Sequence, residues 1–203
     1  MSRREIHTVI GLAAIVFPAL YVVSDVMELA AGRLYTGQLI VTYLAEATIP
    51  FYVLGLHSVQ AQKGGWMSLV GAVLYGFAFV GFSATVLYPL VTGDRDPDVV
   101  FDDFGGIYDA HAVLAAIGGI LFGLAVLRAS VFPRWTGYTL IGGLLLTALL
   151  VGVGAPEGVQ TIGTAVRSVA FGGMGLACLR AAYGEPGAVR ITETARRSRA
   201  GLG

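Results

Sequence analysis

Long apolar stretches, separated by short polar or glycine-containing breaks, run along almost the whole chain. A helix needs about 20 apolar residues to cross the hydrocarbon core of a bilayer, and six stretches reach that length. They cover residues 7–30, 38–60, 66–91, 107–128, 135–154 and 160–182. The breaks carry turn residues, as in Lys63-Gly64-Gly65. The pattern predicts an all-α polytopic membrane protein, a bundle of six transmembrane helices.

The composition agrees with a membrane protein and excludes several other classes. Of 203 residues, 56% are hydrophobic and only 13% are charged, and the mean hydropathy is +0.75. A soluble fold is excluded by these values. The formal net charge is zero, and the chain has none of the basic patches that bind nucleic acid. Because Cys178 is the single cysteine, no intrachain disulfide can form.

The positions of the basic residues predict the orientation of the chain. When alternate breaks are pooled, ten Lys and Arg residues fall on one side, two fall on the other, and Arg167 lies inside the sixth stretch. The ten are Arg3, Arg4, Lys63, Arg128, Arg134, Arg180, Arg190, Arg196, Arg197 and Arg199, and the two are Arg33 and Arg95. Because basic residues concentrate in cytoplasmic loops, we expect a multi-pass protein of the cell membrane with both termini in the cytoplasm. Residues 1–183 would form the transmembrane domain, and residues 184–203 a flexible basic tail near anionic lipid headgroups.

A threefold internal repeat is visible in the apolar stretches. The second, fourth and sixth stretches end alike, around Gly55, Gly123 and Gly175. The first, third and fifth begin alike, with a hydroxyl residue three positions before a glycine, as at Thr8 and Gly11. The repeat suggests three tandem helical hairpins. Small residues let transmembrane helices approach closely, so we interpret the glycines as packing positions.

Ionisable residues inside the apolar stretches predict a buried polar cluster. Asp25 is expected roughly 10 Å and Glu46 roughly 13 Å below the loops on the side away from the cytoplasm, and Arg167 reaches the same layer. The repeat aligns Glu46 with His111. Ionisable groups at this depth cost several kcal/mol unless they are paired or hydrated, so we expect them in an interior cavity and not facing lipid.

The charges of this cluster indicate acid/base chemistry. Three carboxylates, Asp25, Glu28 and Glu46, would oppose Arg167, so at least one should be protonated unless a cation is bound. The candidate acid/base residues are Asp25, Glu46 and His111. The residues expected to line a substrate site are Tyr21, Glu28, Tyr43, Tyr88, Tyr108, Asp109 and Arg167. A purely structural alternative is that Arg167 pairs with Glu46 or Glu28 to fix helix register. No ExxH pair occurs, so neither a metal nor a cofactor is expected.

Three functions are compatible with this cluster. The first is an integral membrane enzyme that isomerises, cyclises or hydrolyses a lipophilic substrate such as a prenyl lipid or terpenoid. Its design is similar to that of integral-membrane terpene cyclases, although no motif matches residue by residue. The second is a proton- or cation-coupled transporter or channel subunit, which at this size would require an oligomer. The third is a non-catalytic membrane partner or sensor.

Overall fold

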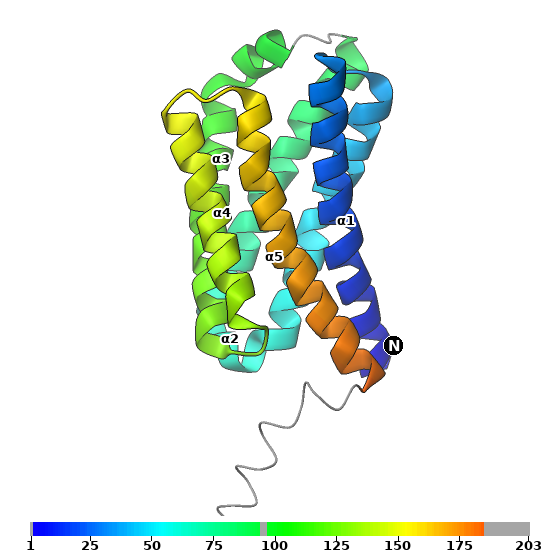
Figure 1. Cartoon of the computed structure of the whole chain (residues 1–203), viewed down its shortest axis with the longest axis vertical. Coiled ribbons are helices and arrows are strands. Elements are labelled where there is room, and N and C mark those ends of the chain that lie inside the picture. Colours follow the sequence, from blue (N-terminus) through cyan, green and yellow to red (C-terminus); the bar gives the residue numbers. More distant parts are fainter. Residues whose placement is uncertain (1, 94–96, 185–203) are drawn as a thin grey trace, which may run out of the picture.

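The computed structural model describes residues 2–93 and 97–184, with side chains except for residues 97–103 and 157. The predicted tail is therefore outside the described residues apart from Gly184. The described chain is all helical, without strands, and its five helices form one bundle (Figure 1). They are α1 (Arg3–Ala31), α2 (Thr36–Thr92), α3 (Pro97–Ala129), α4 (Arg134–Gly152) and α5 (Glu157–Tyr183). Each is long and apolar enough to span a membrane.

The count of five differs from the predicted six because stretches 38–60 and 66–91 both fall within α2. This helix has 57 residues, which would measure roughly 85 Å if straight, against about 30 Å for a bilayer core. It is not straight: Gly65 leaves the helical conformation, with φ 57° and ψ −156°. The turn is so tight that no separate loop divides residues 36–64 from residues 66–92.

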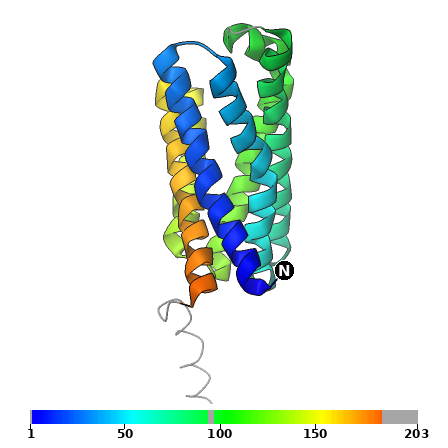
Figure 2. The ribbon, with the colours of Figure 1, turned by 90° about the vertical axis from the view of Figure 1, so that its right-hand side faces the viewer.

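The two halves of α2 run antiparallel on either side of Gly65 (Figure 2). A Cβ atom added to Gly76 would lie 3.0 Å from the Cα of Pro50, so the halves pack closely far from the turn. Near the turn, Ser68 Oγ lies 2.9 Å from His57 Nδ1 and accepts a hydrogen bond of 2.9 Å from Gln60 Nε2. The predicted break at Lys63-Gly64-Gly65 thus coincides with a reversal of the chain.

Glycines at the ends of the repeated stretches hold neighbouring helices together. A Cβ on Gly175 of α5 would lie 2.6 Å from the backbone oxygen of Gly11 in α1. A Cβ on Gly55 would lie 2.8 Å from Ile10, and one on Gly123 would lie 2.7 Å from Ile141. These close approaches agree with the interpretation of the glycines as packing positions.

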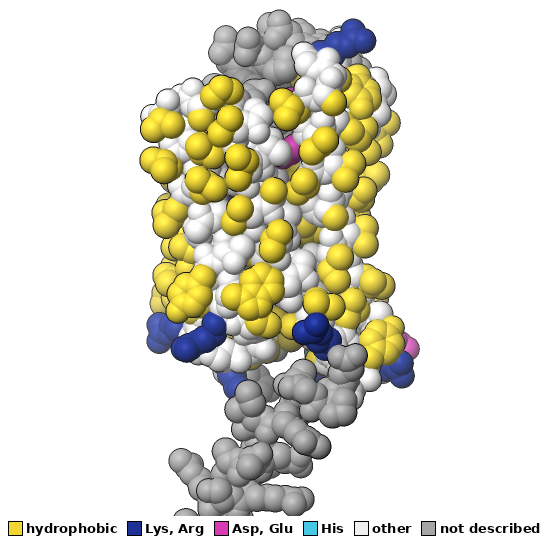
Figure 3. Space-filling model, in the orientation of Figure 1, with side chains coloured by type: hydrophobic (Ala, Val, Ile, Leu, Met, Phe, Trp, Pro, Cys, Tyr) yellow, Lys and Arg dark blue, Asp and Glu magenta, His cyan; other side chains and the backbone are white. Residues whose placement is uncertain are grey.

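Basic side chains gather at one end of the bundle, and the surface above them in this view carries many hydrophobic and few charged side chains (Figure 3). The residues concerned are Arg3, Arg4, Lys63, Arg128, Arg134 and Arg180, all exposed. We call this end, where α1 begins and α5 ends, the basic end. The distal end is the opposite one, where α1 ends in the left-handed conformation of Gly32. The interior between the two ends is a core rich in aromatic residues, including Tyr52, Tyr75, Phe79, Phe122 and Phe171.

Candidate functional site

A row of polar side chains lies between α1 and the first half of α2. On α1, Tyr21, Ser24 and Glu28 recur every three or four residues and therefore share one face. On α2, Gln38, Thr42 and Glu46 recur every four residues and share another. Hydrogen bonds join the two faces. We call these six residues the polar seam.

The distal part of the polar seam is organised around the amide of Gln38. Its Nε2 donates to Glu28 Oε2 at 3.0 Å, to Thr42 Oγ1 at 3.0 Å and to Ser24 Oγ at 3.3 Å. The Ser24 and Thr42 hydroxyls are also hydrogen bonded to each other. Gln38 is only 1% exposed, and its Oε1 is buried without a partner. The Thr42 hydroxyl also donates to the backbone oxygen of Gln38 at 3.0 Å, so in this part of the seam Gln38 Oε1 is the buried acceptor that no described residue satisfies.

The inner part of the polar seam contains a buried carboxyl group. Glu46 is 4% exposed, and its Oε1 accepts a hydrogen bond of 3.1 Å from the Tyr21 hydroxyl. Its Oε2 is buried and has no hydrogen-bond partner among the described residues. A buried carboxyl oxygen without a partner is unfavourable and marks a place where a proton or a water molecule would be stabilised.

Arg167 of α5 supplies positive charge beside the polar seam. Its Nη2 donates to Thr164 Oγ1 at 2.9 Å, whereas its Nε is buried and has no partner in the described part of the chain. Asp25 of α1, which is half-buried, interacts electrostatically with Arg167 and Thr164. Arg167 also lines one cavity together with Tyr21 and Tyr75. The side chains of Asp25, Glu46 and Arg167 are therefore linked, directly or through Tyr21, as one charged layer.

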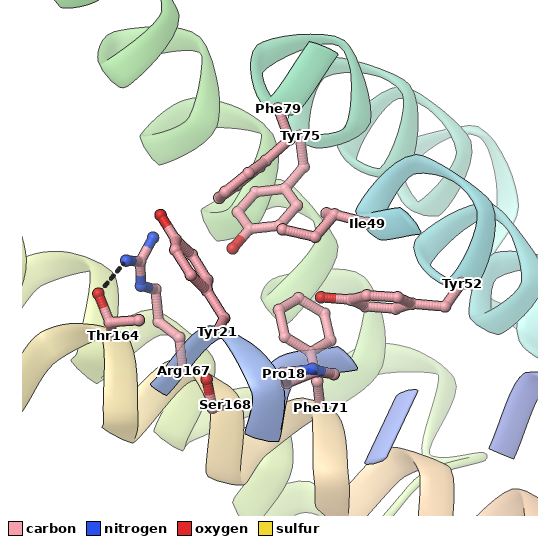
Figure 4. A pocket seen from close by; sticks show the side chains of 10 residues that line it. All are labelled: Pro18, Tyr21, Ile49, Tyr52, Tyr75, Phe79, Thr164, Arg167, Ser168 and Phe171. Atoms are coloured by element: carbon pink, nitrogen blue, oxygen red, sulfur yellow. Dashed lines mark hydrogen bonds between the residues drawn. The ribbon is translucent and has the colours of Figure 1, made fainter. Parts of the chain in front are cut away.

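A small cavity lies next to this layer (Figure 4). Arg167 and Tyr21 lie on one side of it, and Tyr52 and Tyr75 approach from α2 (Figure 4). The remaining lining residues are Pro18, Ile49, Phe79, Thr164, Ser168 and Phe171. The space open to the centre of a water molecule is about 10 Å³, close to the minimum for one water. Pockets for drug-sized ligands measure about 300–1,000 Å³, so in this conformation the cavity is on the scale of water.

His111 lies outside the polar seam, although the repeat aligns it with Glu46. Its Nδ1 is 2.7 Å from the backbone oxygen of Ile107, in its own helix. Its ring stacks on Phe77, with ring centres 5.8 Å apart, and rests against Gly81, where an added Cβ would lie 2.1 Å from the ring. His111 therefore lies apart from Glu46, because α3 presents this side chain to the second half of α2.

The other predicted substrate-site residues are divided between two places. Tyr108 packs on Phe82 with ring centres 5.1 Å apart. Phe82 packs in turn on Phe79, which contacts the ring of Tyr21, so Tyr108 lies near the charged layer. Tyr43 and Tyr88 instead pack against a small apolar cluster that contains Leu34, Leu39 and Val86. Asp109 is exposed. The structure therefore brings Tyr21, Asp25, Glu28, Glu46, Tyr108 and Arg167 together, and leaves Tyr43, Tyr88, Asp109 and His111 apart.

Sequence reasoning missed the uncharged members of the site, namely Ser24, Gln38, Thr42, Tyr52 and Tyr75. A signal for two of them was available, since Gln38 and Thr42 precede Glu46 by eight and four residues on the same helical face.

Comparisons with protein-family models, curated proteins and solved structures find no match for this chain. The polar seam and its cavity are therefore the basis for a functional proposal.

Proposed function

We propose that the chain crosses the cell membrane six times, as three tandem hairpins, with the basic end in the cytoplasm. Residues on both sides of Gly65 would each make one crossing, as would α1, α3, α4 and α5. The excess of Lys and Arg at the basic end supports this orientation, because cytoplasmic loops are enriched in basic residues. Both the start of α1 and the end of α5 lie at that end (Figure 1).

We propose further that the protein binds and releases a proton at Glu46, as a subunit of a proton-coupled transporter or channel. The observation that carries this proposal is the environment of Glu46: a carboxyl 4% exposed, with one donor, one unpartnered oxygen and a water-sized cavity nearby. Intramembrane carboxyl groups that face the interior of a bundle commonly mark proton or ion pathways. Proton exchange needs no more room than a water molecule occupies.

The neighbours of Glu46 support the same role. The Tyr21 hydroxyl holds the carboxyl in one orientation and can exchange a proton with it. Arg167 keeps a fixed positive charge in the layer, which offsets the charge of an ionised carboxyl. The polar seam extends from Glu46 to Gln38 and the half-buried Glu28 beside it, about 12 Å along α2, which is the rise of the eight residues from Gln38 to Glu46. A polar route of this kind would connect Glu46 with water at the distal end.

A second candidate is an enzyme that uses Asp25 and Glu46 for acid/base chemistry on a lipophilic substrate. It is favoured by one observation: Asp25 is only half-buried and interacts with Thr164 and Arg167 of α5. Acidic atoms are visible at the surface between α1 and α5 (Figure 3). A substrate entering sideways from the lipid would meet these groups. The water-sized cavity disfavours this candidate, because the substrate would require a much larger open form.

Proton flux through liposomes tests the proposal. Full-length protein is reconstituted with a pH-sensitive dye inside, and a potassium gradient with valinomycin sets the membrane potential. We expect wild-type protein to pass protons and Glu46→Gln to reduce the rate at least about tenfold, a loss typical of removing a proton-transfer group. Asp109→Asn serves as the matched control, because Asp109 is an exposed carboxyl outside the seam. Equal rates for wild type and Glu46→Gln would contradict the proposal.

A lipid-product assay separates the second candidate from the first. Wild type, Asp25→Asn and Glu46→Gln are each incubated with prenyl lipids, and the products are resolved by mass spectrometry. A product that is lost in both variants, together with liposomes that pass no protons, would favour the enzyme. An unchanged lipid profile in wild type would exclude the substrates tested.

A further inference from the structure

The distal part of the polar seam concentrates oxygen atoms around one point. Three acceptors, from Ser24, Glu28 and Thr42, lie within 3.0–3.3 Å of the Nε2 atom of Gln38. An amide nitrogen carries only two hydrogens, so it cannot satisfy three acceptors with good geometry at once. The acceptors come from two helices, which places the point between α1 and the first half of α2.

Gln38 contributes a fourth oxygen that has no partner. The side chain is 1% exposed, and Oε1 makes no hydrogen bond with any residue that the structure describes. A buried carbonyl oxygen left unpaired is destabilising and calls for a donor or a cation. The last torsion of a glutamine side chain is soft, so the amide can turn to exchange the positions of its nitrogen and oxygen. Four oxygens would then face the same point.

This set of oxygens has the chemistry of a site for a hard monovalent cation. Two hydroxyls, one amide carbonyl and one carboxylate supply oxygen alone, which suits hard ions and not soft transition metals. Only one of the four ligands, Glu28, can carry a negative charge. In the described part of the chain no three His, Cys, Asp or Glu side chains gather as a metal site, and Arg167 is near the seam, so a divalent ion would be poorly compensated.

We propose that Ser24, Glu28, Gln38 and Thr42 bind one alkali cation within the membrane-spanning bundle. The cation would take the place of the Gln38 amide hydrogens, to which the three acceptors now bond. The site lies on the distal side of Glu46 along the polar seam. Cation binding there goes beyond proton binding at Glu46 and does not depend on it.

A purely structural network would leave the same hydrogen bonds but would not respond to ions. The test therefore compares ions on the full-length protein in detergent micelles. Binding of radioactive ²²Na⁺ is measured at equilibrium, with unlabelled Na⁺, K⁺ or choline as competitor. Thermal unfolding midpoints are measured at constant ionic strength in NaCl, KCl and choline chloride, because a ligand that binds only the folded state raises the midpoint.

The expected result is saturable binding of about one alkali ion per chain, with a higher midpoint in NaCl or KCl than in choline chloride. Thr42→Val and Gln38→Leu should weaken binding at least about tenfold. Thr48→Val is the matched control, because within the described residues the Thr48 hydroxyl bonds to its own helix, at the backbone oxygens of Leu44 and Ala45. Glu46→Gln should keep the ion response, which separates this site from the proton proposal.

Two outcomes would overturn the alkali-cation site. One is wild-type protein that binds neither Na⁺ nor K⁺ saturably and unfolds at the same temperature in all three salts. The other is ion binding that Thr42→Val and Gln38→Leu leave as strong as in Thr48→Val. The first outcome uses wild-type protein alone, so it remains decisive even if a variant fails to fold.

Discussion

Alanine at Gly118 tests how tightly α3 packs on α2. A Cβ atom there would lie 2.4 Å from the backbone nitrogen of Tyr75 and 3.0 Å from the backbone oxygen of Gly71. The contact is reciprocal, since a Cβ on Gly71 would lie 2.5 Å from the backbone nitrogen of Phe122. The closest atoms are backbone atoms in helices, which cannot turn away as a flexible side chain can.

The size of the effect follows from these distances. Ordinary van der Waals contacts begin near 3.4 Å, so relieving a 2.4 Å approach requires α2 and α3 to separate by about 1 Å. A separation of this size loses about a quarter to a half of the dispersion energy of each contact where the helices cross. Overpacking of this kind typically costs about 1–3 kcal/mol. The better helix propensity of alanine returns up to about 1 kcal/mol. We expect Gly118→Ala to lower the free energy of unfolding by about 1–2 kcal/mol.

The control for this substitution is Gly142→Ala in α4. A Cβ there meets no atom within 4 Å, so no overpacking opposes the gain in helix propensity. The free energy of unfolding should therefore stay the same or rise by up to about 1 kcal/mol. Unfolding in mixed micelles, driven by increasing SDS and followed by helical circular dichroism, measures both variants. The packing argument is refuted if Gly118→Ala is as stable as wild type, or if both variants shift equally.

Three more substitutions have definite expected outcomes. Gly65→Ala should destabilise the protein by about 1–3 kcal/mol in the same SDS titration, because φ 57° and ψ −156° belong to a region almost restricted to glycine. Tyr21→Phe should lower the free energy of unfolding by about 1–3 kcal/mol, because it removes the donor to the buried Oε1 of Glu46. The control is Tyr138→Phe, at an exposed tyrosine. If both variants lose the same free energy of unfolding, the Tyr21–Glu46 bond is not important for stability. His111→Phe should leave liposome proton flux at the wild-type rate, because the ring packs among Phe77 and other residues away from the seam.

The sequence predicted the helical class and the positions of the apolar segments well, because an apolar run of about 20 residues matches the thickness of the hydrocarbon core of a bilayer. The break at Gly64-Gly65 was also visible from residue type alone. The number of separate helices could not be predicted in this way, because the chain reverses at the single residue Gly65 and residues 36–92 remain one continuous helical element. Spacing could also indicate that Tyr21, Asp25 and Glu28 share a face, because that relation is local to one helix.

The sequence did not reveal which faces of different helices contact each other. The repeat aligned Glu46 with His111, but an alignment says nothing about how each helix is rotated. The rotation of α3 depends on close contacts such as the His111 ring against Gly81, which no periodicity reveals. Gln38 and Thr42 were missed because uncharged polar residues are common in membrane helices, and only the observed contact with α1 distinguishes them. Likewise, the size of the cavity follows from side-chain packing that a sequence does not display.

Infrared difference spectroscopy of the full-length protein in lipid bilayers tests proton binding at Glu46 most directly. Spectra taken in acidic and alkaline solution report the carbonyl stretch of protonated carboxyl groups. The proposal predicts a carboxylic-acid band that changes with pH in wild type and in Asp109→Asn, and that is missing in Glu46→Gln. The same pH-dependent band in Glu46→Gln as in wild type would show that the proton is held elsewhere, and would contradict the proposal.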